Sequence, residues 1–208
     1  MRVNMQSSQV SNINIQCDNV SQVRAFSTAI FTLKGQPVGR SLINEIEQLG
    51  REGKKITVNI DKKSGCFAKA KLTEDQARVL NIPDDVSNEE NHLQSYFFST
   101  KSFDGINSLG TSVYVNWNPL ESSQVDDDGK IIKDKNANSN FITLCHELIH
   151  AYHIMNGAAL VDSIDEQYLT GESTRNEEQS VIGLGRFEHE RFTENKIRAE
   201  HGLKLRRQ

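Results

Sequence analysis

The sequence predicts an α+β domain in which one long helix packs beside a small mixed sheet. Apolar residues at helical period predict an amphipathic helix over residues 141–155. Apolar residues that alternate with polar ones predict strands over residues 54–60 and 110–119. Shorter helical patterns lie on both sides of these strands. Both kinds of element within 208 residues indicate one domain with its own core.

Composition excludes several classes of partner. The net charge is −4 with mixed signs, which gives no electrostatic reason to expect nucleic acid or an anionic membrane as a partner. The longest run that is mostly apolar, residues 25–33, is too short to cross a bilayer. Cys17, Cys66 and Cys145 are scattered and odd in number. They predict reduced thiols and hence a reducing compartment.

The first 24 residues are polar and rich in Ser, Asn, Gln and Val. They contain no apolar stretch of the kind that a cleaved secretory signal needs. This composition predicts a flexible segment over residues 1–24 and a single folded domain over residues 25–208. The segment is either an ordinary disordered terminus or an export signal that is not cleaved. Composition does not decide between these two.

Several elements are expected before residue 120. A helix should begin at Gly39 and end near Gly50, because Leu42, Ile43, Ile46 and Leu49 share one face. Residues 54–60 should follow as a strand, then a basic turn over residues 62–65. Helices are expected over residues 73–80 and 88–97, the second with Ser87 as its N-cap. In the strand predicted over residues 110–119, Val113, Val115 and Trp117 alternate with polar neighbours, and Tyr114 takes the opposite face. Residues 125–129 should form the tip of a hairpin.

Residues 146–150 read His-Glu-Leu-Ile-His. On a helix, His146 and His150 lie one turn apart on the same face, so both imidazoles can bind one Zn²⁺. Glu147 can reach a water molecule near the ion and act as the general base for peptide hydrolysis. The helix has an apolar stripe separate from the histidine flank, Asn138 or Ser139 as a cap and Gly157 as a C-terminal stop. The sequence therefore predicts a zinc-dependent peptidase.

A catalytic zinc needs a third protein ligand and an open position. Glu178 is the preferred candidate, because it shares a helix face with Val181 and Ile182 and should point inward. Glu177 is the reserve, since its spacing from Thr174 matches a capping box. His153 lies on the same flank as the two histidines and suits a supporting or substrate-facing role better than ligation. Three acidic residues closer in sequence rank lower: Asp162, Asp165 and Glu166.

Two further features concern the substrate. Peptidases with this helix motif usually have an edge strand that pairs with the substrate backbone. The strand over residues 110–119 is either that edge strand or an ordinary strand of the sheet. Peptide hydrolysis also needs a hydrogen-bond donor for the tetrahedral oxyanion. His153, Tyr168, His189 and Arg198 are candidates for contact with the substrate or the transition state. A last helix should run from Thr193 to His201 and end at Gly202.

Three blocks occur in a fixed order: residues 146–153, residues 176–185 and residues 193–206. Over residues 105–208 they resemble the NleD-type, or HopH-like, zinc metalloprotease effectors, which bacteria inject into host cells by type III secretion. The resemblance implies a gluzincin-like zincin fold, with His146 and His150 as zinc ligands, Glu147 as the base and a downstream glutamate completing the site. It also implies one zinc ion per chain and cleavage of host protein kinases of the JNK and p38 type, in the activation loop.

The resemblance further implies delivery by the type III secretion machinery, with or without a chaperone, and action in the host cell cytoplasm. Reduced thiols and the lack of a cleavable signal agree with that expectation. Two alternatives stay open. One is a zinc peptidase toxin domain that cuts another substrate. The other is a catalytically silent module that binds its target, although an intact Glu147 has no use in such a module.

Overall fold

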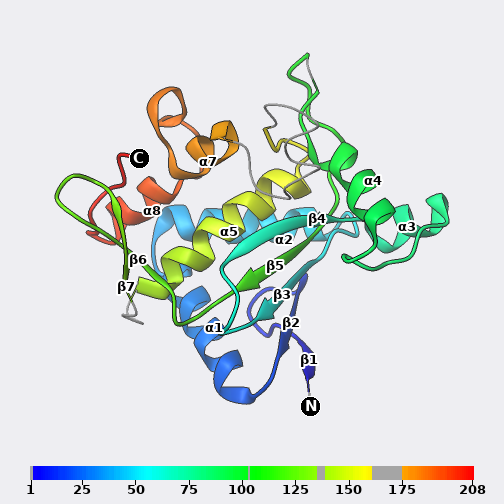
Figure 1. Cartoon of the computed structure of the whole chain (residues 1–208), viewed down its shortest axis with the longest axis horizontal. Helices are drawn as coiled ribbons and strands as arrows, with labels where there is room; N and C mark the ends of the chain where they lie inside the picture. The colour runs from blue at the N-terminus through cyan, green and yellow to red at the C-terminus, as the bar shows by residue number, and fades with distance from the viewer. Residues whose placement is uncertain (1, 103, 135–138, 161–174) are drawn as a thin grey trace.

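A five-stranded mixed sheet and the helices on one of its faces form the fold in the computed structural model (Figure 1). The structure describes residues 2–102, 104–134, 139–160 and 175–208. The strand order is β1-β2-β3-β5-β4. The bounds are β1 Val3–Gln6, β2 Ile13–Cys17, β3 Ile56–Ile60, β4 Phe67–Lys71 and β5 Ser112–Trp117. The three inner strands are parallel, and the two outer strands are antiparallel to their neighbours.

Within the described residues, two helices precede β3, two lie between β4 and β5, and three follow residue 139. Their bounds are α1 Val20–Lys34, α2 Pro37–Gly50, α3 Glu74–Leu80, α4 Glu89–Ser99, α5 Asn140–Met155, α7 Arg175–Ile182 and α8 Glu194–Glu200. A short 3₁₀ turn, η2, spans Gly185–Phe187, and the hairpin strands are β6 Ser122–Val125 and β7 Ile131–Asp134. The chain is thus an α+β protein with a mixed sheet. No helix in the described ranges is both long and apolar enough to span a bilayer.

Alternation along the strands decides which face of the sheet is covered. Ile15, Val58 and Val115 are paired neighbours on β2, β3 and β5 and are almost fully buried. Helices α1, α2 and α5 pack together, with α5 against β4 and β5 and α1 against β2. This apolar layer is the core, and it fixes α5 relative to the edge of the sheet. Trp117 lies in it and donates from its indole nitrogen to Thr143 Oγ1 of α5 at 3.2 Å.

The N-terminal residues differ from the prediction of a flexible segment over residues 1–24. Strands β1 and β2 belong to the sheet, and the predicted boundary at residue 25 falls inside α1. Ile13, Ile15 and Cys17 are buried, whereas Asn14 between them is exposed. A strand with only one buried face has polar residues at every second position, so its average composition is polar. For this reason, the composition of residues 1–24 did not reveal the strands.

The strand predicted over residues 110–119 is β5, and it lies inside the sheet between β3 and β4. Its interpretation as an edge strand is therefore wrong, and β4 is the edge strand on this side. As predicted, Trp117 and Tyr114 take opposite faces of the strand; Trp117 is the one that is buried, and Tyr114 is only partly covered. The N-cap of α4 is Asn88 rather than Ser87, because the Asn88 side chain accepts a hydrogen bond from the Asn91 amide.

Candidate metal centre

Three side chains from two helices meet beside the edge of the sheet. His146 and His150 come from α5, and Glu178 comes from α7. The two Nε2 atoms of the histidines lie 3.2 Å apart. Glu178 Oε1 lies 3.1 Å from His150 Nε2, and Glu178 Oε2 lies 3.3 Å from His146 Nε2. One donor atom from each residue can therefore face a common point.

These separations suit a tetrahedral metal ion. With metal–ligand distances typical of zinc, two ligand atoms of a tetrahedral site lie about 3.3 Å apart. The two Nε2 atoms lie 3.2 Å apart, and each lies 3.1 or 3.3 Å from a different oxygen of the Glu178 carboxylate, so each separation is close to that value. Two N–H groups cannot face each other at such a distance without repulsion, whereas two lone pairs can share a cation. The donor set of two imidazoles and one carboxylate is one that Zn²⁺ accepts.

The helix that carries the histidines is held at both ends. At its start, Asn140 donates from its amide to the Pro119 carbonyl at 3.0 Å, which ties α5 to the end of β5. At its end, Gly157 adopts a left-handed conformation with φ 63°, as the C-terminal stop requires. A Cβ at Gly157 would lie only 2.1 Å from the Ser108 carbonyl oxygen. These contacts fix the direction in which the histidine flank faces.

Carboxylates behind the histidines orient the two rings. Glu194 Oε2, at the start of α8, lies 2.8 Å from His146 Nδ1. Glu177 Oε1 lies 3.2 Å from His150 Nδ1. A carboxylate that accepts from Nδ1–H leaves Nε2 with its lone pair directed at the metal. Both histidines of the cluster have this support.

The groups of the cluster shift one another's pKa. Burial alone would lower the pKa of His146, but hydrogen bonds to Glu178 and Glu194 raise it to about 9. Burial opposes ionisation of Glu178, but its hydrogen bonds to both histidines hold its pKa far below the usual range. Without a cation, the histidines would hold protons to balance the carboxylates. A divalent cation can take over that role.

The Glu194 carboxylate is itself held by two guanidinium groups. Arg198 Nε donates to Glu194 Oε1 at 2.6 Å, and Arg206 Nη1 donates to Glu194 Oε2 at 3.0 Å. Arg198 also donates to the Ser123 carbonyl of β6 at 2.7 Å, and its side chain is 2% exposed. Although burial opposes it, these contacts and His146 keep the pKa of Glu194 at about 2. Arg198 therefore positions Glu194 and does not face a substrate.

Glu177 and His153 form the corresponding support on the other side. Glu177 Oε1 lies 2.8 Å from His153 Nδ1, and Glu177 Oε2 accepts from the Leu160 amide at 2.8 Å. Glu177 is thus directed at His150 Nδ1, while its neighbour Glu178 reaches Nε2. His153 contacts Glu177, which is also the partner of His150, and His153 itself lies outside the three-residue cluster.

A cleft of about 240 Å³ opens in front of the cluster. Glu147 lines this cleft together with His146 and Glu178. Its side chain is largely buried, and burial raises its pKa. A carboxylate with a raised pKa beside a metal-type cluster is suited to accept and release a proton.

Not every predicted residue lies at this centre. The His189 side chain is 89% exposed and pairs with Glu188 at 3.1 Å, so the proposed contact of His189 with the transition state is not supported. Tyr168 and the acidic residues Asp162, Asp165 and Glu166 lie outside the described residues, as does Thr174 of the expected capping box.

Among the cleft residues that escaped prediction, Cys66, Glu194 and Arg206 carry groups that could take part in chemistry. Glu194 and Arg198 stand four residues apart, a spacing typical of an ion pair on a helix. That spacing could have indicated them, although nothing in it points to His146. Cys66 is brought to the cleft by the loop before β4, and burial raises the pKa of its thiol to about 12. Such a thiol is unreactive.

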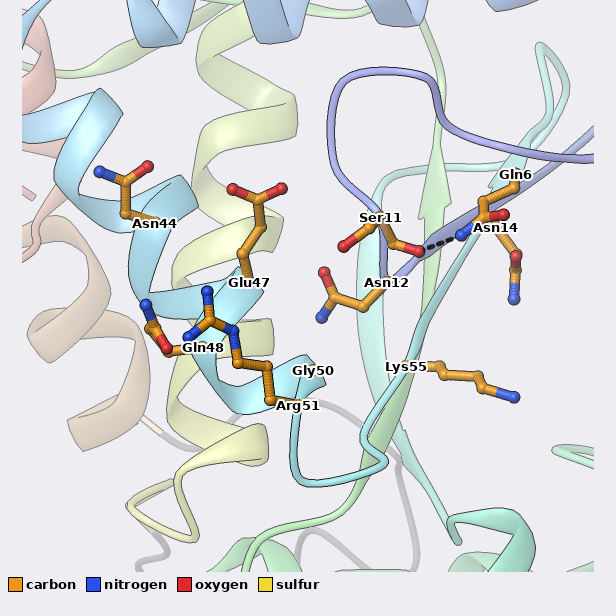
Figure 2. A pocket seen from close by; sticks show the side chains of 10 residues that line it. All are labelled: Gln6, Ser11, Asn12, Asn14, Asn44, Glu47, Gln48, Gly50, Arg51 and Lys55. Atoms are coloured by element: carbon orange, nitrogen blue, oxygen red, sulfur yellow. Dashed lines mark hydrogen bonds between the residues drawn. The ribbon is translucent and has the colours of Figure 1, made fainter.

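A larger cavity, of about 660 Å³, lies away from the cluster, between the β1–β2 turn and the end of α2 (Figure 2). Amide side chains dominate its lining, with Glu47, Arg51 and Lys55 as the charged groups. It contains neither histidine nor cysteine. Its size therefore does not mark it as the centre of the chemistry.

Comparison with known protein families gives a decisive match. The model of the peptidase family M91, described as effector proteins, matches residues 13–208. The chain belongs to this family. No curated protein is significantly similar to it. The family match begins within the first strands of the sheet and includes α5, α7 and α8. The chain is thus an effector of a peptidase family, which implies a protein substrate.

Proposed function

We propose that this M91 effector is a zinc-dependent endopeptidase of the gluzincin-like zincin type. His146, His150 and Glu178 would hold the ion. The observation that carries the proposal is that the two Nε2 atoms lie 3.2 Å apart, with one Glu178 oxygen 3.1 Å from His150 and the other 3.3 Å from His146. Glu147 lies in the adjoining cleft. The bound ion would supply a Lewis acid for the peptide carbonyl and make water a better nucleophile.

Glu147 would act as the general base. Its carboxylate accepts the proton of the attacking water and can pass it to the leaving amine nitrogen. Burial keeps this carboxylate away from bulk water, so the proton it holds stays available for transfer. The partly exposed Glu178 side chain leaves one side of the cluster open to a substrate.

Strand β4 is suited to hold the substrate backbone. It pairs with β5 on one side and is the last strand of the sheet. An extended peptide can add to the free edge of such a strand by main-chain hydrogen bonds. Helix α5 packs against β4, so a peptide added there would pass the metal cluster.

Arg206 is the best placed donor for the oxyanion. It lines the cleft with Glu147, and its side chain is 14% exposed. Its Nη1 donates to Glu194 and its Nε to the Gln208 carbonyl at 3.3 Å, which leaves the N–H groups of Nη2 to face the reacting carbonyl. This proposal replaces the roles predicted for Arg198 and His189.

We further propose the biological role that the resemblance to NleD-type effectors implies. The protein would be delivered by type III secretion and act in the host cytoplasm. Its substrates would be host protein kinases of the JNK and p38 type, cut in the activation loop. The family match to effector proteins supports this role.

Mapping of new peptide ends in host-cell lysate tests the proposal. Wild-type protein should create a small set of new N-termini, among them ends within kinase activation loops. A chelator or Glu147→Gln should abolish them. Glu188→Gln, a change at an exposed carboxylate away from the cleft, should leave them intact. New ends that persist with the chelator and with Glu147→Gln would refute zinc-dependent proteolysis.

The same experiment separates the two alternatives. A toxin domain with another substrate would create ends outside kinases, again in a chelator-sensitive way. A silent module would create none and would retain its target in a pull-down. The Glu147 position in the cleft favours catalysis over the silent module.

A further inference from the structure

A second, smaller cavity lies behind His150, between the edge strand and helix α4. Its volume is about 30 Å³. Its walls come from four elements and the turn after α5, and they include His150 of the metal cluster and Glu177, which supports His150. The cavity therefore adjoins the metal centre, and it shares no lining residue with the main cleft.

The edge strand makes room for this cavity. Ala68 and Ala70 are the two positions of β4 that face it with only a methyl group. Phe67, Lys69 and Lys71 carry long side chains and alternate with them. Paired residues of neighbouring strands point to the same face of the sheet. Every second side chain of a peptide added to the edge of β4 would therefore lie on the same face as Ala68 and Ala70.

Tyr96, which lines this cavity, carries a polar atom without a partner among the described residues. The residue is only 5% exposed, and its buried hydroxyl makes no hydrogen bond within the described part of the chain. Its neighbour on α4, Ser99, donates to the Tyr96 carbonyl at 2.9 Å and so is already engaged. A buried hydroxyl without a partner is costly, because it has given up its hydrogen bonds to water. The other walls are mixed. Ile154 and Ala159 are apolar, whereas the remaining lining residues are polar or charged: Lys69, His92, His150 and Glu177.

We propose that this cavity is a specificity subsite for a small side chain that carries a hydrogen-bonding group, and that Tyr96 is its specificity-determining residue. This inference rests on the proposed peptidase function. The volume admits about two water-sized groups, which matches Thr, Ser or Asn and excludes aromatic and long side chains. The Tyr96 hydroxyl would bond the polar group of that residue, while the methyl groups of Ala68 and Ala70 pack against its carbon atoms.

The preference can be measured with matched peptides. In a peptide that the wild type cleaves, each position near the cleaved bond, on either side of it, is changed in turn to Thr and to Val. These two residues have the same shape. At one position, kcat/KM should be about tenfold higher for Thr than for Val, since a site built to bond a hydroxyl rejects the analogue without it. In Tyr96→Phe, the ratio of kcat/KM for the Thr peptide to that for the Val peptide should fall to about 2 or less, chiefly because kcat/KM for the Thr peptide falls.

Two variants make this test specific. Tyr152→Phe is the control, because the Tyr152 ring packs on Phe192 and does not line the cavity. It should keep the wild-type ratio. Ala70→Leu should fill the cavity and shift the preference at the same position to Gly and Ala.

The inference and the proposed function fail in different ways. If the wild type cleaves peptides but Tyr96→Phe keeps the full Thr/Val ratio, the subsite is refuted and the peptidase stands. If the wild type cleaves no peptide with zinc bound, the proposed function fails and the subsite fails with it. Thermal unfolding tests the subsite without relying on catalysis: the Tm of Tyr96→Phe should be equal to or higher than the Tm of the wild type. A marked fall would show that the hydroxyl already has a structural partner, such as a fixed water, and would contradict the subsite.

Discussion

At the scale of residues, the candidate centre shows how two adjacent glutamates take different roles. Glu177 and Glu178 are neighbours on α7, but successive helical positions differ by about 100°. Glu178 therefore reaches the Nε2 atoms, and Glu177 reaches Nδ1 of His150. One contributes a donor atom to the metal cluster, and the other fixes a ring that does so.

Replacement of each glutamate by alanine, in separate variants, tests this assignment. Glu178→Ala should weaken zinc binding more than Glu177→Ala, because it removes a ligand, whereas Glu177→Ala removes only support for His150. Loss of a supporting carboxylate typically weakens metal binding about 10- to 100-fold. Competition with a zinc chelator measures both constants. The reverse order would show that Glu177 is the ligand.

The support behind His146 gives a second test. Glu194→Gln preserves shape but removes the charge that two arginines and His146 share. Zinc affinity should fall about 10- to 100-fold, as for other partners of metal-binding histidines. Glu188→Gln is the matched control on the surface. An affinity equal to wild type in Glu194→Gln would rule out an orienting role.

At the scale of elements, helix ends connect distant parts of the chain. The N-cap position of α2, Gln36, gives no side-chain hydrogen bond to the helix. Instead, Glu200 at the end of α8 accepts from the amides of Val38 and Gly39 at 2.8 and 2.9 Å. The same short helix that supplies Glu194, the partner of His146, thus caps α2.

Glu200→Ala should lower the free energy of unfolding by about 1 kcal/mol, the usual effect of losing a cap. Urea denaturation measures it, and Glu188→Ala serves as the exposed control. The zinc affinity of the purified variant should stay close to wild type, since Glu200 does not touch the cluster. Unchanged stability would mean that solvent replaces the cap without loss.

The elements also show how far the sequence predicts this fold. Helices α2 and α5 and strands β3 and β5 follow from periodicity, because each has a clear apolar face. Helices α3 and α8 follow from their caps, Thr73 and Thr193. Strands β1, β2 and β4 were missed: FAKAK and INIQC each place small or polar side chains on one face. Whether a strand lies at an edge depends on pairing between distant residues, which no local pattern contains.

The residues of the site likewise divide into those that local spacing predicts and those that only the tertiary fold brings together. His146, Glu147 and His150 lie within one helical turn, so their spacing alone brings them together. Glu178 was selected by the helical face that it shares with Val181 and Ile182. Glu194 and Arg206 approach α5 only through tertiary packing of α8 and the C-terminal residues, so local spacing could not assign them to His146.

At the scale of the whole molecule, the metal cluster joins helices that are distant in sequence. His146 and His150 lie on α5, Glu178 lies on α7, and α8 supports His146 from behind. Without a cation, this region holds three buried or partly buried carboxylates against protonated histidines. Bound zinc should therefore stabilise the fold as a ligand of the native state.

Removal of zinc should lower Tm, and the addition of zinc should restore it. Differential scanning calorimetry with a chelator, and then with excess zinc, measures the shift. In Glu178→Ala the shift should be smaller, because the native state binds zinc less tightly. A Tm independent of zinc in the wild type would contradict the link between the metal and the fold.

The most direct measurement for the central claim is the zinc content of the purified wild-type protein. Elemental analysis should find about one Zn²⁺ per chain, lost in a His146→Ala, His150→Ala double variant and retained in Glu147→Gln. Protein that is folded and proteolytically active with no bound metal would contradict the account.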